Sequence, residues 1–317
     1  MDDMGRTRHY GEFYGQGRPE QAGDDRPLWL VIGNCQAEAL RQALEAATDP
    51  PFRTVRVPPV HELETADLPH LGALLDRTAV LLSQPIRPDY RDLPIGTDQL
   101  AAALPGAATV LRWPVIRYAG LYPFQVIVRH PADRSVVPPP VPYHDVRTVA
   151  AALAGRAPGD PWDIDVEPAR FCAVAEASRA SLAERERRDT DVGVSDVLAS
   201  AGCDAAHAIN HPGNTVLAEL ARRVLDALGV GGTVALRERP LLGSVHAPLE
   251  QRVLDALQLT GPARPQWSFH GESLDPQRVH EIQLQWYRAN PDYLRLAVDR
   301  HGSTMDLLGL DVRGREA

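Results

Sequence analysis

The chain has 317 residues, 44% of them hydrophobic, which is enough for a soluble core in one elaborated domain or two smaller ones. The formal net charge of −9 argues against nucleic acid as the main partner, because phosphate backbones demand a basic surface. All 33 basic residues are arginine, so a lysine Schiff base, a P-loop lysine and a Ser-Lys dyad are excluded.

Residues 1–27 are polar, glycine-rich and without periodic pattern, and we expect a flexible N-terminal arm there. The start of the chain lacks the apolar run of a secretory signal, and no stretch is apolar over the length of a membrane helix. We therefore expect a cytoplasmic protein without membrane insertion.

A short apolar run at 28–32, closed by Gly33, predicts a strand buried on both faces. Helices and strands alternate after it. The expected helices follow Gly33 and lie near 68–75 and 98–104, and the expected strands lie at 54–57, 79–82 and 108–111. This alternation predicts an α/β fold with a Rossmann-like or SGNH-like parallel sheet in the N-terminal half.

The C-terminal half is expected to be largely helical, with helices at 167–188, 215–228, 249–257 and 276–287 and a proline-rich connector at 136–142. We expect a catalytic domain over 28–240 and a helical extension over 241–317 that packs on it. The sequence does not decide the oligomeric state, and a homo-oligomer stays open.

The loops after the first and third strands, 33–36 and 83–87, carry an unusual density of polar side chains. Ligands bind at the carboxyl ends of parallel strands. Cys35 would begin a helix, where the dipole and free amides favour the thiolate. The backbone N–H of Gln36, with the side-chain amide of Asn34 or Gln84, could stabilise an oxyanion. The alternative is that Cys35 is a small buried residue at a tight turn.

A cysteine nucleophile needs a base, and His211 is the best candidate, because Pro212 and Gly213 hold it rigidly before a helix. The alternative is an ordinary loop histidine with Asn214 as N-cap. Asp145, in the Tyr143-His144-Asp145 segment, could orient a histidine or bind substrate, or could simply cap a helix.

Arginines at the expected strand ends could bind a phosphorylated cofactor, because bidentate guanidinium contacts suit phosphate oxygens. They are Arg87, Arg91, Arg112 and Arg117, and about half of them are expected to be merely solvated. Three cysteines without a CxxC pair predict neither a disulfide framework nor a metal site. Cys172, on the apolar stripe of its helix, and Cys203 are expected to be structural.

Five motifs in this order resemble the WcbI family of polysaccharide biosynthesis proteins over about residues 28–230. They are Gly33-Asn34-Cys35-Gln36, Ser83-Gln84-Pro85-Ile86-Arg87 with Asp89-Tyr90-Arg91, the segment 118–123, Tyr143-His144-Asp145, and His211-Pro212-Gly213-Asn214.

The resemblance implies a coenzyme A-binding acyltransferase, typically an acetyltransferase of capsular sugars. It implies Cys35 as nucleophile, His211 as general base and Asp145 as the third member of a triad. Asn34, Gln36 and Gln84 become oxyanion or orienting groups. The expected cofactor contacts are Ser83, Arg87, Arg91, Arg112, Tyr143, His144 and Asn214. The acceptor would be a hydroxyl or amine of a sugar or secondary metabolite.

Two other functions stay open. The same dyad could pass the acyl group to water, as in a thioesterase, esterase or amidase. The chain could also be a non-catalytic binding module in which Cys35 has no chemical role.

Overall fold

The structure is a computed structural model that describes residues 9–16, 24–236 and 238–310. The described residues form two compact units, each assembled from three stretches of chain. The first unit takes residues up to 116, 183–197 and 213–241, and the second takes 117–182, 198–212 and the residues from 242 onward. The predicted segments 28–240 and 241–317 are consecutive, whereas the two units are interleaved along the chain.

The first unit contains a four-stranded sheet in the order β2-β1-β3-β4, and every neighbouring pair is parallel. Its strands are β1 (Leu28–Ile32), β2 (Arg53–Thr54), β3 (Thr78–Ser83) and β4 (Thr109–Arg112). All five residues of β1 are buried, as a central strand covered on both faces requires. The predicted α/β fold with a parallel sheet is confirmed.

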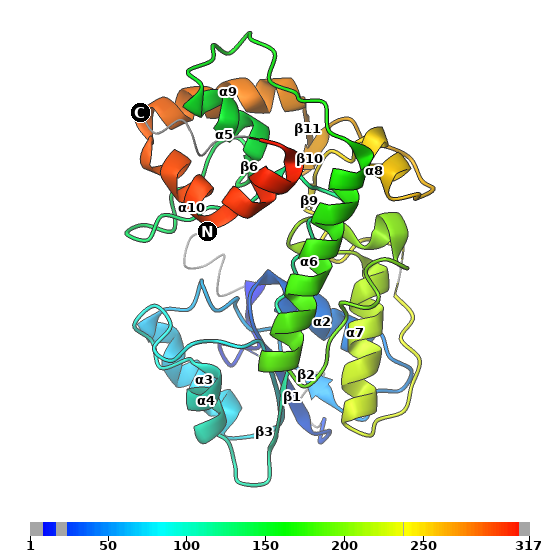
Figure 1. The fold of residues 1–317 in the computed structure, drawn as a ribbon. Coiled ribbons are helices and arrows are strands. Elements are labelled where there is room, and N and C mark those ends of the chain that lie inside the picture. Colours follow the sequence, from blue (N-terminus) through cyan, green and yellow to red (C-terminus); the bar gives the residue numbers. More distant parts are fainter. Residues whose placement is uncertain (1–8, 17–23, 237, 311–317) are drawn as a thin grey trace. The chain divides into compact units, whose positions relative to one another are not determined.

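Helices cover both sides of these strands. Figure 1 shows α3 and α4 on one side and α2 and α7 on the other, where α2 and α7 pack against each other. The helices are α2 (Cys35–Glu45), α3 (Leu68–Leu75), α4 (Thr97–Ala102) and α7 (Asn214–Ala227), with a short 3₁₀ helix η2 (Thr65–Asp67).

Residues 9–16 pack on the first unit, which corrects the expectation of a flexible arm for this stretch. Tyr10 and Phe13 are buried in the core beside the strand residues, and the Tyr14 hydroxyl donates to Asp67 Oδ1 over 2.8 Å. Three aromatic side chains in five residues bury enough apolar surface to hold this segment. The rest of the predicted arm at 1–8 and 17–23 lies outside the described residues.

The second unit combines helices with short antiparallel strands. Helix α6 (Pro168–Asp189) begins here and ends in the first unit, and the other helices are α5 (Val146–Leu153), α8 (Gln251–Ala256), α9 (Pro276–Ala289), α10 (Asp292–Leu308) and the 3₁₀ helix η3 (Gly202–Asp204). Strand β5 (Gln125–Val126) pairs with β6 (His144–Asp145), β7 (Ala206–Ala208) pairs with β8 (His211–Pro212), and β9 (Val245–His246), β10 (Trp267–Phe269) and β11 (Glu272–Leu274) form one small sheet.

These strands are two or three residues long, too short for the alternating pattern that marks a strand in a sequence. Helices α5, α9 and α10 pack together around an aromatic and aliphatic core. Within the described ranges, no helix has both the length and the apolar composition to span a bilayer.

Candidate active site

The strand order reverses between β1 and β3, and in open α/β sheets such a switch point opens a crevice at the carboxyl ends of the strands. Cys35 follows β1 and Gln84 follows β3. The two loops are joined directly, because the Asn34 backbone N–H donates to Gln84 Oε1 over 2.9 Å. The expected nucleophile thus lies at the position where this fold places ligands.

Gly33 is required by a close approach rather than by its backbone angles. A Cβ at this position would lie 2.6 Å from Gln84 Oε1 and 2.8 Å from Gln84 Cδ. Real Cβ atoms do not approach other atoms so closely, so the Gln84 carboxamide can reach the Asn34 N–H only across a glycine.

Cys35 is the first residue of α2, and Asn34 is its N-cap, with Oδ1 accepting the Gln36 backbone N–H over 2.9 Å. The thiol is partly buried. Burial raises the pKa of Cys35, while the backbone N–H groups of Cys35 and Gln36 lower it less and Glu62 adds a further small rise. The direction of this shift is opposite to the one expected from the helix start alone, because desolvation outweighs the backbone N–H groups.

The side chains of Gln36 and Gln84 are fully occupied by protein partners. Gln36 Nε2 donates to the Ile116 carbonyl over 2.7 Å, and its Oε1 accepts the Ile116 N–H over 3.0 Å. Gln84 Nε2 donates to Gln36 Oε1 over 3.2 Å and to the Pro114 carbonyl over 3.4 Å. Both carboxamides therefore hold the loops in place, and they differ from the expected oxyanion donors.

Asn34 differs from Gln36 and Gln84 because no group of the described chain occupies its side-chain donor. Its Oδ1 caps the helix, and no hydrogen bond occupies its Nδ2 among the described residues. Asn34 Nδ2 and the Cys35 backbone N–H are therefore the candidate donors to an oxyanion.

Ser83 is fully buried, and its hydroxyl donates to the Gln84 carbonyl over 2.8 Å and lies 3.1 Å from Thr97 Oγ1. A side chain so enclosed cannot contact a cofactor, which corrects that expectation. Its role is to hold the start of the 84–87 loop.

A cavity of about 620 Å³ lies beside the ends of β3 and β4. Four arginines line it: Arg87, Arg112, Arg187 and Arg188. Arg112 pairs with Asp98 and Arg188 with Asp189, each at 2.8 Å. The guanidinium groups of Arg87 and Arg187 make no ion pair or hydrogen bond within the part of the chain that the structure describes. We refer to this site as the arginine cavity.

The sequence predicted Arg87 and Arg112 near a cofactor, and it gave no such role to the arginines at the end of the helix expected at 167–188. The fold brings Arg187 and Arg188 to the arginine cavity from about 75 residues beyond Arg112, and no local sequence pattern predicts this. Arg91 is exposed, has a positive φ of 57°, and is not among the residues that line the cavity.

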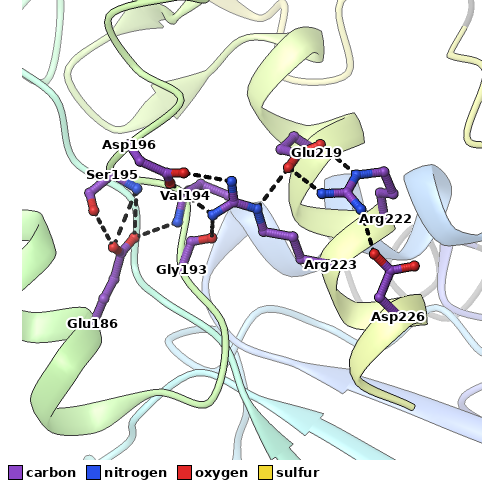
Figure 2. Close-up of polar contacts among 9 residues, drawn as sticks. All are labelled: Glu186, Gly193, Val194, Ser195, Asp196, Glu219, Arg222, Arg223 and Asp226. Carbon is purple, nitrogen blue, oxygen red and sulfur yellow. Dashed lines mark hydrogen bonds and ion pairs between the residues drawn. The ribbon is translucent and has the colours of Figure 1, made fainter. Parts of the chain in front are cut away.

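The segment after α6 is held by a buried carboxylate (Figure 2). Glu186 accepts the N–H groups of Val194 and Ser195, at 2.7 and 3.1 Å, and the Ser195 hydroxyl. A Cβ on Gly193 would lie 2.6 Å from Glu186 Oε2. These contacts fix the loop that returns from Arg187 and Arg188.

A second clamp fixes the same loop to α7. Arg223 donates to the Gly193 carbonyl over 2.8 Å and pairs with Asp196 and Glu219 at 2.7 Å each (Figure 2). Closer to the arginine cavity, the Asp191 backbone N–H donates to the Arg112 carbonyl and its carboxylate accepts the Arg112 N–H, at 2.9 and 2.6 Å. The backbone that carries Arg112, Arg187 and Arg188 is therefore fixed.

His211 belongs to the second unit, on β8. Burial lowers its pKa to about 4, and nearby His246 and His270 lower it too, against the backbone carbonyls of Leu242 and Val245 that raise it. The imidazole is therefore neutral at neutral pH and able to accept a proton. Its Nδ1 is buried with no hydrogen-bond partner among the described residues.

Asp145 is committed to another group. Its carboxylate caps α5 by accepting the Arg147 backbone N–H over 2.8 Å, and it pairs with the Arg147 guanidinium at 2.6 Å. The expected role as third triad member is therefore not supported by its contacts, and the groups recorded around His211 are histidines and carbonyls instead.

Three other expected cofactor contacts are held by protein groups. His144 is buried with Nδ1 2.5 Å from the Tyr287 hydroxyl, and burial lowers its pKa to about 3. The Tyr143 hydroxyl donates to Asn210 Oδ1 over 2.9 Å. Asn214 donates to the Arg239 carbonyl and accepts the Leu241 N–H, each over 3.0 Å, while Gly213 is the N-cap of α7.

The remaining cysteines make local contacts. Cys172 is exposed rather than on the buried stripe of α6, and its thiol donates to the Ala256 carbonyl over 3.2 Å. Cys203 is partly buried, with Sγ 3.6 Å from the Thr260 carbonyl. Within the described ranges, no group of three or more histidine, cysteine or acidic residues could hold a metal ion.

Comparison with known proteins identifies the family. The family model described as polysaccharide biosynthesis enzyme WcbI matches residues 28–233, which include Cys35, the arginine cavity and His211. The chain belongs to the WcbI family. It is thereby placed among polysaccharide biosynthesis enzymes, and no curated protein matches it.

A solved WcbI structure has the same fold as this chain. It has 17% sequence identity and a TM-score of 0.73, over 90% of this chain and 99% of the other. That structure is described as a novel polysaccharide biosynthesis enzyme, in the native form without a disulfide bond between coenzyme A and a cysteine. At this identity the likeness shows the fold, and it extends beyond the family match toward the C-terminus.

Proposed function

We propose that this WcbI-family chain is an acyltransferase that takes an acyl group, most simply acetyl, from acyl-coenzyme A onto Cys35 and passes it to a hydroxyl or amine. The observation that carries the proposal is the position of Cys35. Its thiol lies at the switch point of the sheet, at the first residue of a helix, between a capping asparagine and two locked glutamines.

The arginine cavity supports the choice of donor. Coenzyme A carries a pyrophosphate and a 3′-phosphate, and the free guanidinium groups of Arg87 and Arg187 can each form charge-assisted bonds to phosphate oxygens. The chain has no lysine that could do so. The description of the solved WcbI structure also names coenzyme A.

The chemistry follows from a neutral thiol and a neutral imidazole. As Cys35 Sγ attacks the thioester carbonyl, its proton passes to a general base, the role that the sequence resemblance gives to His211, and the charge on the carbonyl oxygen is stabilised by the Cys35 N–H and Asn34 Nδ2. The carbon–sulfur bond to coenzyme A then breaks, and the departing thiol takes that proton. The acceptor hydroxyl next attacks the thioacyl carbon and gives its proton to the same base. The carbon–Sγ bond then breaks, and the base returns the proton to Cys35, which restores the thiol.

A mass measurement tests the covalent step. After incubation with acetyl-CoA, intact-mass analysis is expected to show one acetyl adduct, which Cys35→Ala removes and Cys172→Ala does not. The Cys172 thiol is the matched control because it is exposed and outside the site. Absence of an adduct, together with unchanged turnover in Cys35→Ala, would reject the nucleophile.

Binding of the cofactor tests the arginine cavity separately. Arg87→Ala and Arg187→Ala are each expected to weaken coenzyme A binding about tenfold, as loss of one charge-assisted contact implies. Arg222→Ala is the control, since Arg222 lies on the exposed surface of α7 in pairs with Glu219 and Asp226. Equal affinities in all three variants would place the phosphates elsewhere.

Acceptor dependence separates transfer from hydrolysis. Release of coenzyme A that is equally fast with and without added sugars or amines would indicate a hydrolase built on the same residues.

A further inference from the structure

The second unit encloses a cavity of about 480 Å³ that the proposed chemistry does not use. Its residues come from the segments 121–125, 143–148, 162–163, 247–253 and 263–267 and from α9. Five aromatic side chains line it: Tyr122, Phe124, Tyr143, Trp162 and Trp267. Tyr143 and Trp267 are stacked on each other, with ring centroids 5.7 Å apart and planes 24° apart. We refer to this site as the aromatic cavity.

Three residues of the aromatic cavity each have one buried polar atom with no partner in the described structure. They are Gln125 Nε2, His280 Nε2 and Gln283 Oε1. The side chains are 6%, 1% and 1% exposed. An unpaired buried polar atom costs about 1–3 kcal/mol, and three of the nine such atoms among the described residues belong to side chains that line this cavity.

The other polar atom of each side chain is fixed by the protein. Gln125 Oε1 accepts the Ile209 N–H over 2.9 Å, and Gln283 Nε2 donates to the Tyr143 carbonyl over 2.8 Å. His280 Nδ1 lies 2.8 Å from Thr148 Oγ1, and its ring stacks on Trp162 with centroids 4.3 Å apart. The three unpaired atoms are therefore held in place before any ligand binds.

The charges of the aromatic cavity are paired among themselves. The Arg147 guanidinium contacts Asp145, Asp163 and Glu250 within 2.9 Å and lies over the Phe124 ring at 3.8 Å. Arg264, the other arginine of the lining, donates to the Ala247 carbonyl and the Tyr122 hydroxyl. Three carboxylates and two engaged arginines make the aromatic cavity unfavourable for a phosphate. The arginine cavity also has three carboxylates, but among the described residues the guanidinium groups of Arg87 and Arg187 have no partner there.

We infer that the aromatic cavity binds a neutral sugar ring. Aromatic side chains suit the apolar faces of a sugar ring, and fixed amide and imidazole groups suit its hydroxyls. Sugar binding in this cavity does not depend on the proposed function.

Saturation-transfer NMR tests the inference with methyl α-D-glucopyranoside, methyl β-D-galactopyranoside and methyl α-D-mannopyranoside as probes. Each is used at about 10 mM, enough to populate a site with a millimolar Kd. We expect transfer to at least one glycoside. His280→Asn is expected to weaken it about tenfold, because asparagine can keep the bond to Thr148 but has no atom at the Nε2 position.

His280→Gln is the matched variant. Glutamine places an amide near the Nε2 position and gives up the Thr148 contact, so glycoside binding is expected to survive in it. Thermal unfolding of both variants shows whether either has lost the fold. No transfer to any of the three glycosides, or undiminished transfer in a folded His280→Asn, would overturn the inference. Binding of coenzyme A to this cavity in place of the sugar would overturn it too.

The acetyl adduct on Cys35 is measured in the same wild-type samples. If the adduct forms and no glycoside binds, the inference fails and the proposed function stands. If a glycoside binds and no adduct forms, the proposed function fails and the sugar site stands.

Discussion

Replacement of Gly33 by alanine tests whether the Cys35 loop depends on the contact between Gly33 and Gln84. A new Cβ would lie 2.6 Å from Gln84 Oε1, and ordinary contact begins at 3.4 Å, so the carboxamide must retreat by about 0.8 Å. Such a shift stretches the 2.9 Å bond from the Asn34 N–H beyond hydrogen-bonding range. Overpacking and the lost bond together predict a loss of about 2–4 kcal/mol of unfolding free energy.

A double-mutant cycle isolates this contact. Gln84→Ala alone is expected to cost about 2–4 kcal/mol, because it leaves the Asn34 N–H unpaired and opens a space beside Gly33. In the double variant the alanine methyl group enters that space, so Gly33→Ala adds almost nothing. Gly72→Ala is the control: no atom lies within 4 Å of its new Cβ, and a helical Gly-to-Ala change is neutral or stabilising.

The assay is urea unfolding followed by tryptophan fluorescence, with peptide-resolved alkylation of Cys35 by iodoacetamide. Gly33→Ala is expected to lower the unfolding midpoint and change the Cys35 alkylation rate while leaving Cys172 unaffected. If the double variant loses the sum of the two single losses, the close approach is not the reason for glycine, and the reasoning fails.

Three further results are expected. Glu186→Ala should lower the unfolding free energy by about 3 kcal/mol and Glu186→Gln by less, because alanine leaves the Val194 and Ser195 N–H groups without their acceptor; equal urea midpoints for both would contradict this. Burial lowers the pKa of both His207 and His211 from 6.5 to about 4, so the unfolded chain binds more protons between these values. Stability is thus complete above about pH 7 and declines as the pH falls toward 4, by up to about 3 kcal/mol per histidine, and His207→Asn should flatten this profile in urea titrations. Asn214→Ala should cost about 1–2 kcal/mol by thermal unfolding, since it frees the Arg239 carbonyl and the Leu241 N–H, whereas Arg222→Ala on the same helix should stay within about 0.5 kcal/mol.

Local pattern was sufficient to predict the parallel sheet. The apolar run at 28–32 became β1 with the same bounds, and the helix expected near 68–75 became α3 over Leu68–Leu75. The strand expected at 54–57 is paired only at Arg53–Thr54, although Val55 and Val57 are buried. The apolar residues of a sequence predict which positions are buried, whereas the length of a paired strand depends on how far the neighbouring strand extends.

The site was predictable one residue at a time and not as a network. A cysteine after a buried strand and a histidine before a helix carry local signals. The bonds from Gln36 to Ile116 and from Gln84 to Pro114 join residues 80 and 30 positions apart, so nothing near either glutamine distinguishes a clamp from an oxyanion donor. Arg187 was not predicted for the same reason: it is far along the chain from Arg87 and Arg112, and α6 brings it to the arginine cavity.

Because the two units are interleaved along the chain, the order of synthesis determines when each unit can complete its fold. The core of the first unit draws on residues between Tyr10 and Val110, but α7, which packs on α2, begins only at Asn214. At about 5–20 residues per second, a ribosome needs roughly 5–20 s for the intervening hundred residues. For that interval one face of α2 stays uncovered in the nascent chain. The core of the second unit is completed later still, after the residues of α10 have been synthesised. Production of this protein should therefore respond to the supply of chaperones that shield nascent chains.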